Sequence, residues 1–224
     1  MRPALVVLLV GLALAVGIPT TWVLTRPATS AGPPVEQLLA DTPATAPPPT
    51  ATPTAPGSGL PPVTARPATP TVPAPVAPPV RLTVGSVGVD APVDAVGTEP
   101  DGTMTIPADV DRVGWYRFGP APPDPAGSVV VAGHVDDAEQ GLGALAPLRE
   151  TEVGAEVVLT DAAGAVTTWR VVSREAFDKE TVPLAGLFDR AGPPRLVLIT
   201  CGGPFLGDID SYRDNVVVIA EPVR

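Results

Sequence analysis

Residues 80–224 are predicted to form an all-β domain, a barrel or a sandwich, with short helical insertions. Short runs rich in Val, Ile and Thr recur through this region between turn residues, which is the pattern of many short strands. The helical candidates between these runs are brief. About 145 residues suit one domain. Because the chain has a single cysteine, that domain needs its own core rather than an internal disulfide.

The strand candidates follow one another along this domain. They cover residues 80–84, 91–96, 127–135, 195–200 and 214–220, and two more lie within 156–177, around a Gly-containing turn at 162–164. Short helices are expected at residues 141–149 and 182–188, and Trp115 is expected in the core. Closing such strands into a barrel removes the exposed edges that would otherwise invite aggregation.

Residues 1–26 are predicted to be a signal anchor or a signal peptide. No charged residue occurs between positions 3 and 25, and Arg2 and Arg26 flank this stretch. About 20 apolar residues span a bilayer as a helix, so residues 4–24 are expected to cross the membrane once. Cleavage as a signal peptide near residues 30–31 is the alternative. In both cases the domain is expected outside the cell, and the anchor would place it at the cell membrane.

Residues 27–79 are predicted to be a disordered linker rich in Pro, Thr and Ala. The segment has 17 prolines and no apolar periodicity, so we expect it to stay extended without a core. At ~3.1 Å per residue it would reach roughly 160 Å. That length would suit a spacer that holds the domain away from a membrane, within or beyond a cell wall.

The charge and the residue counts argue against two classes of function. The formal net charge is −10, so the basic footprint of a nucleic-acid-binding protein is absent. One histidine and one cysteine cannot form a Cys/His zinc cluster. No pattern in the sequence leads us to predict a metal or another cofactor.

Cys201 and His134 are the first candidates for chemistry. Each is the only residue of its type, and each follows a strand candidate rich in Val or Leu. A thiol reacts as its thiolate, which a neighbouring imidazole can assist. Two strand ends that each carry a reactive residue would suit an active site at a barrel rim. Taken alone, each residue is more often structural.

Arg213 is the third candidate and stands just before the last strand candidate. It follows Cys201 by twelve positions, so it could lie on the neighbouring strand and reach the same rim. Its guanidinium presents five N–H donors in a fixed geometry, which suits a carbonyl or an oxyanion. Gly202 and Gly203, directly after the cysteine, would let backbone or substrate approach closely.

These residues resemble the signature of the sortases. Residues 197–201, VLITC, are similar to the cysteine-bearing strand of that family, usually Thr-Leu-x-Thr-Cys, with Val197 in place of the first Thr. Residues 132–135, AGHV, resemble the end of the family's histidine strand, and Arg213 falls where the family has its arginine. The runs GHVD, TCGG and YRDNVVV resemble the class F sortases of high-GC Gram-positive bacteria in particular. The resemblance covers about residues 80–224.

The resemblance implies a closed eight-stranded β-barrel that acts as a cysteine transpeptidase. Cys201 would attack the Thr–Gly bond of a sorting motif similar to Leu-Pro-x-Thr-Gly and form a thioester. Arg213 would donate to the substrate backbone and the oxyanion, and His134 would protonate the leaving amine. The implied partners are surface proteins with a sorting signal and an amine of a peptidoglycan precursor or cross-bridge.

Thr200, Asp136 and Gly202 are second-tier candidates for substrate binding. In sortases the threonine before the cysteine can touch the substrate backbone, whereas Thr200 could equally be a packing residue of its strand. Asp136 follows His134 by two positions and could orient it, or it could simply be solvated.

A membrane-tethered β-domain without catalysis, which binds the cell wall or a partner protein, is the alternative function. Replacing Cys201 with Ala would leave such binding intact but would abolish the activity of a sortase.

Overall fold

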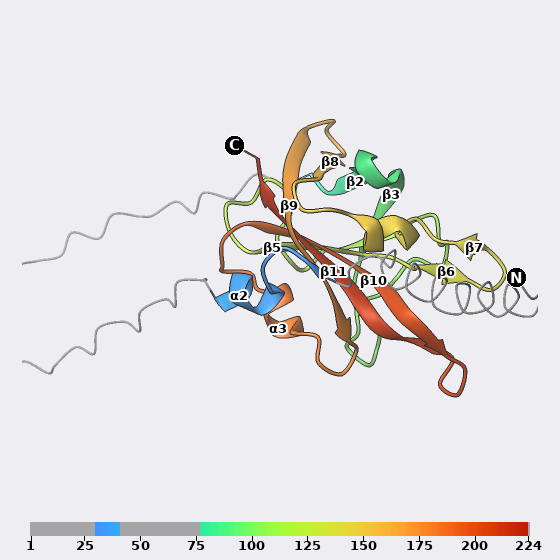
Figure 1. Cartoon of the computed structure of the whole chain (residues 1–224). Coiled ribbons are helices and arrows are strands. Elements are labelled where there is room, and N and C mark those ends of the chain that lie inside the picture. The colour runs from blue at the N-terminus through green and yellow to red at the C-terminus, as the bar shows by residue number, and fades with distance from the viewer. Residues whose placement is uncertain (1–29, 41–76, 224) are drawn as a thin grey trace, which may run out of the picture.

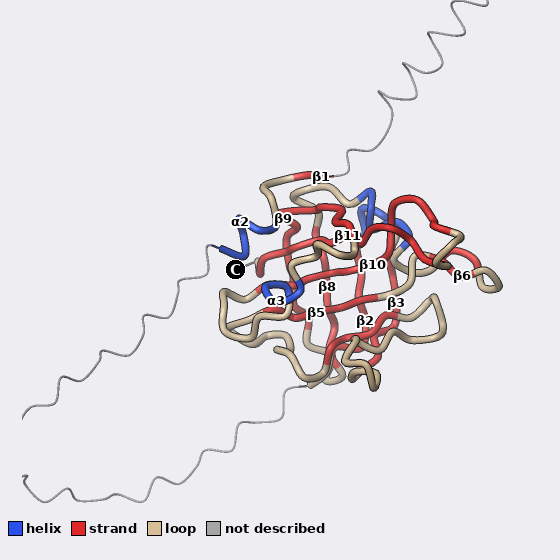
Figure 2. The backbone as a smooth tube through the Cα atoms, turned by 90° about the horizontal axis from the view of Figure 1, so that it is seen from below, coloured by secondary structure: helices blue, strands red, loops and turns tan. Residues whose placement is uncertain are grey.

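The computed structural model describes residues 30–40 and 77–223, and most of them belong to a closed eight-stranded barrel (Figures 1 and 2). The barrel strands are β2 (Pro79–Val84), β3 (Val89–Val96), β4 (Val113–Tyr116), β5 (Ser128–Ala132), β8 (Glu156–Asp161), β9 (Val166–Asp178), β10 (Arg195–Leu206) and β11 (Ser211–Pro222). Around the barrel the order is β9-β11-β10-β5-β4-β3-β2-β8, and β8 pairs back with β9. The predicted all-β barrel is therefore confirmed.

Two of the pairings in the barrel are parallel, and the other six are antiparallel. β5 runs parallel to β10, and β3 runs parallel to β4. β10 and β11 form a long antiparallel hairpin that extends beyond the barrel (Figure 1). β5 ends at Ala132 beside Ile199 of β10, and β10 continues from there into the hairpin, so the end of β5 and the middle of β10 lie at one rim of the barrel.

Apolar side chains fill the barrel and also cover one side of its outer wall. Leu82, Val131 and Leu198 belong to the interior cluster, and none of them is more than 1% exposed. Val130 and Val197, which alternate with interior residues, belong to a second cluster outside the wall. β5 and β10 are thus buried on both faces, which explains why they read as continuous apolar runs. Trp115 lies in the interior cluster, as expected.

The smaller elements lie in the connections and at the N-terminal side. They are β1 (Ser30–Ala31), α2 (Val35–Ala40), η1 (Gly85–Val87), β6 (Asp136–Asp137), β7 (Gly141–Leu142), η2 (Ala146–Glu150) and α3 (Leu184–Leu187). The helix expected at 182–188 is therefore present as α3. The one expected at 141–149 is wrong in its first part: β7 pairs there with β6, and only η2 follows as a 3₁₀ turn.

The prediction of a continuous disordered linker over residues 27–79 is wrong for residues 30–40. β1 pairs with the second half of β9, beyond the residues of β9 that pair with β8, and α2 follows it. Strand β9 is longer than β8, so its second half has an edge that β1 can occupy. Val35, Leu38 and Leu39 have the spacing of one helix face, but prolines surround this short signal on both sides.

Residues 1–29 and 41–76 lie outside the described part of the chain. The expected membrane segment, residues 4–24, falls among them, as does most of the expected linker. Within residues 30–40 and 77–223, no helix has both the length and the apolar character needed to cross a membrane.

Candidate active site

His134 and Cys201 come together because the paired stretch of β5 and β10 ends just before them. Ile199 is the partner of Ala132 in the parallel register, and the Gly133 N–H donates to the Ile199 carbonyl oxygen at 3.1 Å. His134 and Cys201 are each two residues beyond this last register pair. β5 ends at Ala132, whereas β10 continues through Cys201 in its pairing with β11, so the parallel register brings both positions to the same part of the rim.

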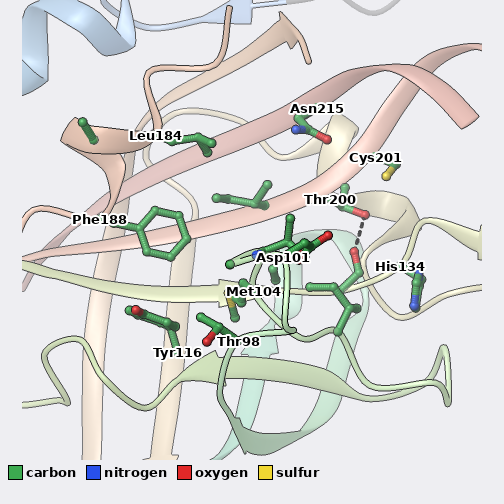
Figure 3. Close-up of a pocket in the computed structure, with 17 residues that line it drawn as sticks. Thr98, Asp101, Met104, Tyr116, His134, Leu184, Phe188, Thr200, Cys201 and Asn215 are labelled. Atoms are coloured by element: carbon green, nitrogen blue, oxygen red, sulfur yellow. Dashed lines mark hydrogen bonds between the residues drawn. The ribbon is translucent and has the colours of Figure 1, made fainter. Parts of the chain in front are cut away.

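Thr200 fastens the two strand ends together. Its side chain is buried, and its hydroxyl donates a hydrogen bond to the Gly133 carbonyl oxygen at 2.9 Å (Figure 3). Gly133 directly precedes His134, and Thr200 directly precedes Cys201. This hydrogen bond therefore joins the histidine strand to the cysteine strand next to both candidate catalytic residues.

A pocket of about 690 Å³ opens beside these two residues. Figure 3 shows Cys201 and His134 at one end of it and Leu184, Phe188 and Tyr116 at the other. The Tyr116 and Phe188 rings pack edge to face, with their centroids 5.2 Å apart. Most of the far end is apolar, so the pocket can receive an extended peptide whose leading side chains are apolar.

The remaining pocket wall comes from the connection between β3 and β4. The lining residues from this connection are Thr98, Asp101, Gly102, Thr103, Met104 and Ile106. Asp101 accepts hydrogen bonds from the Thr103 hydroxyl at 2.7 Å and the Thr103 N–H at 2.9 Å, and these lower the pKa of its carboxyl group. This turn supplies a fixed negative charge at the edge of an otherwise apolar wall.

Cys201 also lines a second, more polar pocket of about 490 Å³ on its other side. Thr200, Gly202 and Asp136 line it too, with Asp214 and residues of η2. Asp136 accepts a short hydrogen bond from the Tyr212 hydroxyl, and this bond is the main reason why the pKa of Tyr212 is raised. Cys201 thus lines two cavities, an apolar one on one side and a more polar one on the other.

Asp137, rather than Asp136, is the acid whose charge is coupled to His134. Its carboxylate accepts hydrogen bonds from the Glu139 and Gln140 N–H groups at 2.9 and 3.0 Å, and these chiefly lower its pKa. The charge of His134 lowers this pKa further. Asp136 is held by Tyr212 instead, so the hypothesis that Asp136 orients His134 gains no support from the geometry.

Arg213 lies on β11 but lines neither pocket in this structure. Its Nε donates to Asp214 Oδ1 at 2.6 Å and its Nη2 to Asp214 Oδ2 at 2.9 Å, and this pair raises the pKa of Arg213. Asn215, two residues on, pairs with Cys201 across the hairpin and lines the apolar pocket. Arg213 is therefore on the strand beside the cysteine, with its guanidinium held by Asp214.

Gly203 makes room for the Asp214 carboxylate. A Cβ atom at position 203 would lie 2.2 Å from Asp214 Oδ2, and the backbone φ is +72°, which favours glycine. The glycine two positions after Cys201 and the aspartate directly after Arg213 thus lie against each other.

A comparison with known protein families shows which family the chain belongs to. The sortase domain family matches residues 82–223. The chain belongs to the sortase family. Sortases are cysteine transpeptidases, so the family supplies the general chemistry for the rim described above.

Solved sortase structures have a similar fold. The chain resembles sortase A from Corynebacterium diphtheriae, in a lid mutant, with a TM-score of 0.50 and 17% identity over 64% of this chain and 69% of that one. It resembles sortase C-1 from Actinomyces oris with a TM-score of 0.50 and 17% identity, over 64% of this chain and 73% of that one. Identities this low support the fold alone. None of the curated proteins matches the chain.

Within the described residues of this sortase, no group of three or more His, Cys, Asp or Glu side chains is arranged to hold a metal ion.

Most residues that form the wall of the sortase pocket could not be predicted from the sequence. Met104, Leu184 and Phe188 line it but belong to no motif, and Asn215 lies in the YRDNVVV run without an assigned role. Tyr116 lines it from β4, a strand that the sequence did not predict, on the face opposite to that of its neighbour Trp115 in the core. The other positions depend on which loops meet at this rim.

Proposed function

We propose that this sortase cleaves a sorting motif similar to Leu-Pro-x-Thr-Gly between Thr and Gly and transfers the acyl part to a cell-wall amine. The observation that carries the proposal is that His134 and Cys201 line one apolar pocket, each two residues beyond the last register pair of the parallel strands β5 and β10. The apolar end would receive the leading Leu and Pro side chains, and the scissile bond would lie at Cys201.

The first half of the reaction forms a thioester. The Cys201 thiolate attacks the threonine carbonyl carbon, a C–S bond forms, and the carbonyl oxygen takes up negative charge as an oxyanion. The C–N bond to glycine then breaks, and the protonated His134 gives its proton to the departing amine. The leaving peptide carries away a neutral amino terminus, and the acyl group stays on the sulfur.

The second half reverses these roles. An incoming amine, from a peptidoglycan precursor or cross-bridge, attacks the thioester carbonyl, and neutral His134 takes the proton that the amine loses. The sulfur leaves as thiolate. Water in place of the amine would give hydrolysis.

Arg213 is proposed to bind the oxyanion or the substrate backbone. For this its guanidinium exchanges at least one of its two hydrogen bonds to Asp214 for one to the substrate. Its side chain is half exposed, with 53% of its area accessible, so such a movement needs no unpacking of the core. Five N–H donors allow it to keep one bond to Asp214 while it donates another.

The sortase class of this chain and its location in the cell are also proposals. The runs GHVD, TCGG and YRDN support class F, and residues 4–24 support a single membrane span with the barrel outside the cell. Only residues 25–29 separate that span from β1, so at ~3.3 Å per residue the barrel would stay within about 17 Å of the span. The Pro-rich segment would then connect α2 to β2, both on the barrel, rather than act as the spacer.

Intact-mass spectrometry of the chain tests the proposed reaction. We expect a mass increase that ends at Thr when the protein is mixed with a pool of Leu-(Pro/Ala)-x-Thr-Gly peptides, and none with Cys201→Ala. The adduct would also identify the preferred motif. No adduct and no cleaved peptide, with a folded protein, would instead favour a domain that binds the cell wall or a partner without catalysis.

A further inference from the structure

Residues 30–40, which we call the N-terminal clasp, lie against the outside of the barrel beside α3 (Figures 1 and 2). Ser30 and Ala31 pair with Glu175 and Arg174 of β9. Gly32 follows with φ of +87°, and a Cβ there would lie 2.3 Å from the Val172 carbonyl oxygen. Only glycine allows the clasp to turn this close to the strand.

Side chains of the barrel hold the clasp through its backbone. The Ser173 hydroxyl donates to the Pro33 carbonyl oxygen at 2.7 Å, and the Val35 N–H donates to Glu175 Oε2 at 2.9 Å. Arg195, only 4% exposed, donates from Nη2 to the Leu38 carbonyl oxygen. A buried guanidinium needs such a partner, so the C-terminal part of α2 satisfies a charged group of the barrel.

The clasp also completes the apolar cluster outside the barrel wall. Val35 is fully buried and belongs to this cluster with Leu187 of α3, Phe177 of β9 and Val197 of β10. Leu38 and Leu39 pack against the same cluster. The clasp is therefore an integral part of the catalytic domain, although a long Pro-rich stretch separates it from the first barrel strand.

One contact links the clasp directly to α3. A Cβ on Gly186 would lie 2.7 Å from Leu39 Cδ1, so the glycine lets the leucine side chain sit against the helix. Leu184, Ala185 and Phe188 line the apolar pocket, whereas Leu187 is buried in the outer cluster. α3 thus stands between the clasp and the pocket.

A helix as short as α3 depends on its neighbours. It has four residues and no side-chain hydrogen bond at its N-terminal end. Isolated helices shorter than about 12 residues are marginal in water. The position of the pocket wall that α3 provides is therefore set by packing against the cluster that the clasp completes.

We propose that the clasp is a positioning element for substrate binding, which acts through the contact of Leu39 with Gly186 and holds α3 as a wall of the peptide pocket. The inference rests on the proposed function in that it takes the apolar pocket as the site for the sorting peptide. Leu39 itself touches no substrate.

The test uses the full chain in detergent and three variants, Leu39→Ala, Gly186→Ala and the double variant. Gly186→Ala alone pushes Cβ against Leu39, and we expect kcat/KM for the sorting peptide to fall about tenfold through KM. Leu39→Ala removes packing, and we expect KM to rise about fivefold. In the double variant the clash is gone and alanine favours the helix, so we expect kcat/KM at or above that of Leu39→Ala, and at least about twofold above that of Gly186→Ala.

Two further readouts separate positioning from general destabilisation. Alkylation of Cys201 by iodoacetamide should keep its rate in all three variants, and hydrogen exchange of the Leu187 and Phe188 amides should become faster in Leu39→Ala. Both amides are bonded within α3 or to Pro183. Val166→Ala, which trims a side chain that is 59% exposed on the barrel, is the control and should change none of these quantities.

Failure of the positioning role and failure of the proposed function would give different results. Unchanged KM and unchanged amide exchange in Leu39→Ala would overturn the positioning role. A double variant as poor as Gly186→Ala would also contradict it, because the contact would then not carry the effect. If the wild-type chain cleaves no peptide, the proposed function fails, and amide exchange alone then decides whether the clasp holds α3.

Discussion

The catalytic rim and the α3 wall lie at opposite ends of one pocket and are held there by different interactions. At the rim, His134 and Cys201 continue two strands that are joined by main-chain hydrogen bonds and by Thr200. At the far end, α3 makes no pairing with the sheet and depends on apolar packing, partly against residues 30–40. The first arrangement is local in the sheet, whereas the second joins segments almost 150 residues apart in the chain.

This difference separates two kinds of experimental effect. Ladder hydrogen bonds fix atoms closely, so changes at the rim should act on the chemical step. Packing of a short helix sets the shape of a binding surface, so changes at the wall should act on KM.

Cys201→Ala is expected to have the largest effect. Removing the proposed nucleophile should lower kcat at least about 10³-fold, because no thioester can form. The thermal unfolding midpoint should change little, since Cys201 is only partly buried. Steady-state peptide cleavage and calorimetry measure both quantities. Retained cleavage would show that the chemistry lies elsewhere.

Arg213→Lys is expected to lower kcat/KM about 10–100-fold. Lysine keeps the charge but lacks the planar fork that can bind Asp214 and a substrate oxygen together. Arg170→Lys, at an exposed position of β9, is the matched control and should leave kinetics unchanged. If Arg213→Lys were as active as the wild type, Arg213 would be a charged surface residue without a role in the reaction.

Thr200→Val tests the hydrogen bond that joins the two rim strands. Valine has nearly the same shape, but it leaves the Gly133 carbonyl without its donor, so the free energy of unfolding should fall by about 1–3 kcal/mol. We also expect kcat to fall about tenfold with little change in KM. Urea unfolding and peptide kinetics provide the data, and Thr168→Val on β9 serves as comparison. A change in KM alone would contradict the division between rim and wall.

Phe188→Ala probes the wall and should act in the opposite way. The lost ring removes apolar contact area next to Tyr116, and we expect KM to rise about tenfold while kcat stays within about twofold. Ile209→Ala, which trims an exposed side chain between β10 and β11, is the control. If kcat fell instead, α3 would influence the chemical step as well.

Tyr212 gives the smallest predicted effect, on the polar side of the rim. Its pKa is raised chiefly by the hydrogen bond to Asp136, so the folded protein retains the phenolic proton more strongly than the unfolded chain. The resulting stability is fully present below the ordinary tyrosine pKa, near pH 10, and is lost as pH rises through the folded pKa. Ultraviolet titration of the phenolate should show one late-titrating tyrosine, absent in Tyr212→Phe. If the difference between the wild-type and variant curves showed the Tyr212 phenol ionising at the ordinary tyrosine pKa, the bond would be contradicted.

Most strands of the barrel could be predicted from the sequence. The elements that could not be predicted, β4, β1 and α2, are all short. Val and Leu runs that are buried on both faces predict the strands at 128–132 and 195–200, whereas the strand at 80–84 is buried only in part, at Leu82 and Val84. β4 is only four residues long, and two of them are Gly and Tyr, so no periodic signal develops. β1 and α2 lie between prolines, and their structure depends on an edge of β9 that the sequence does not reveal.

From the sequence alone, an all-β domain could be predicted, and Cys201 and His134 could be named as candidates for chemistry, because strand patterns and side-chain reactivity depend on near neighbours. Their proposed roles come from the resemblance to sortases. What surrounds these two residues was decided by the tertiary structure. The pocket wall, the hold of Asp214 on Arg213 and the docking of residues 30–40 beside α3 depend on loop packing and on contacts between distant segments, which no local pattern encodes.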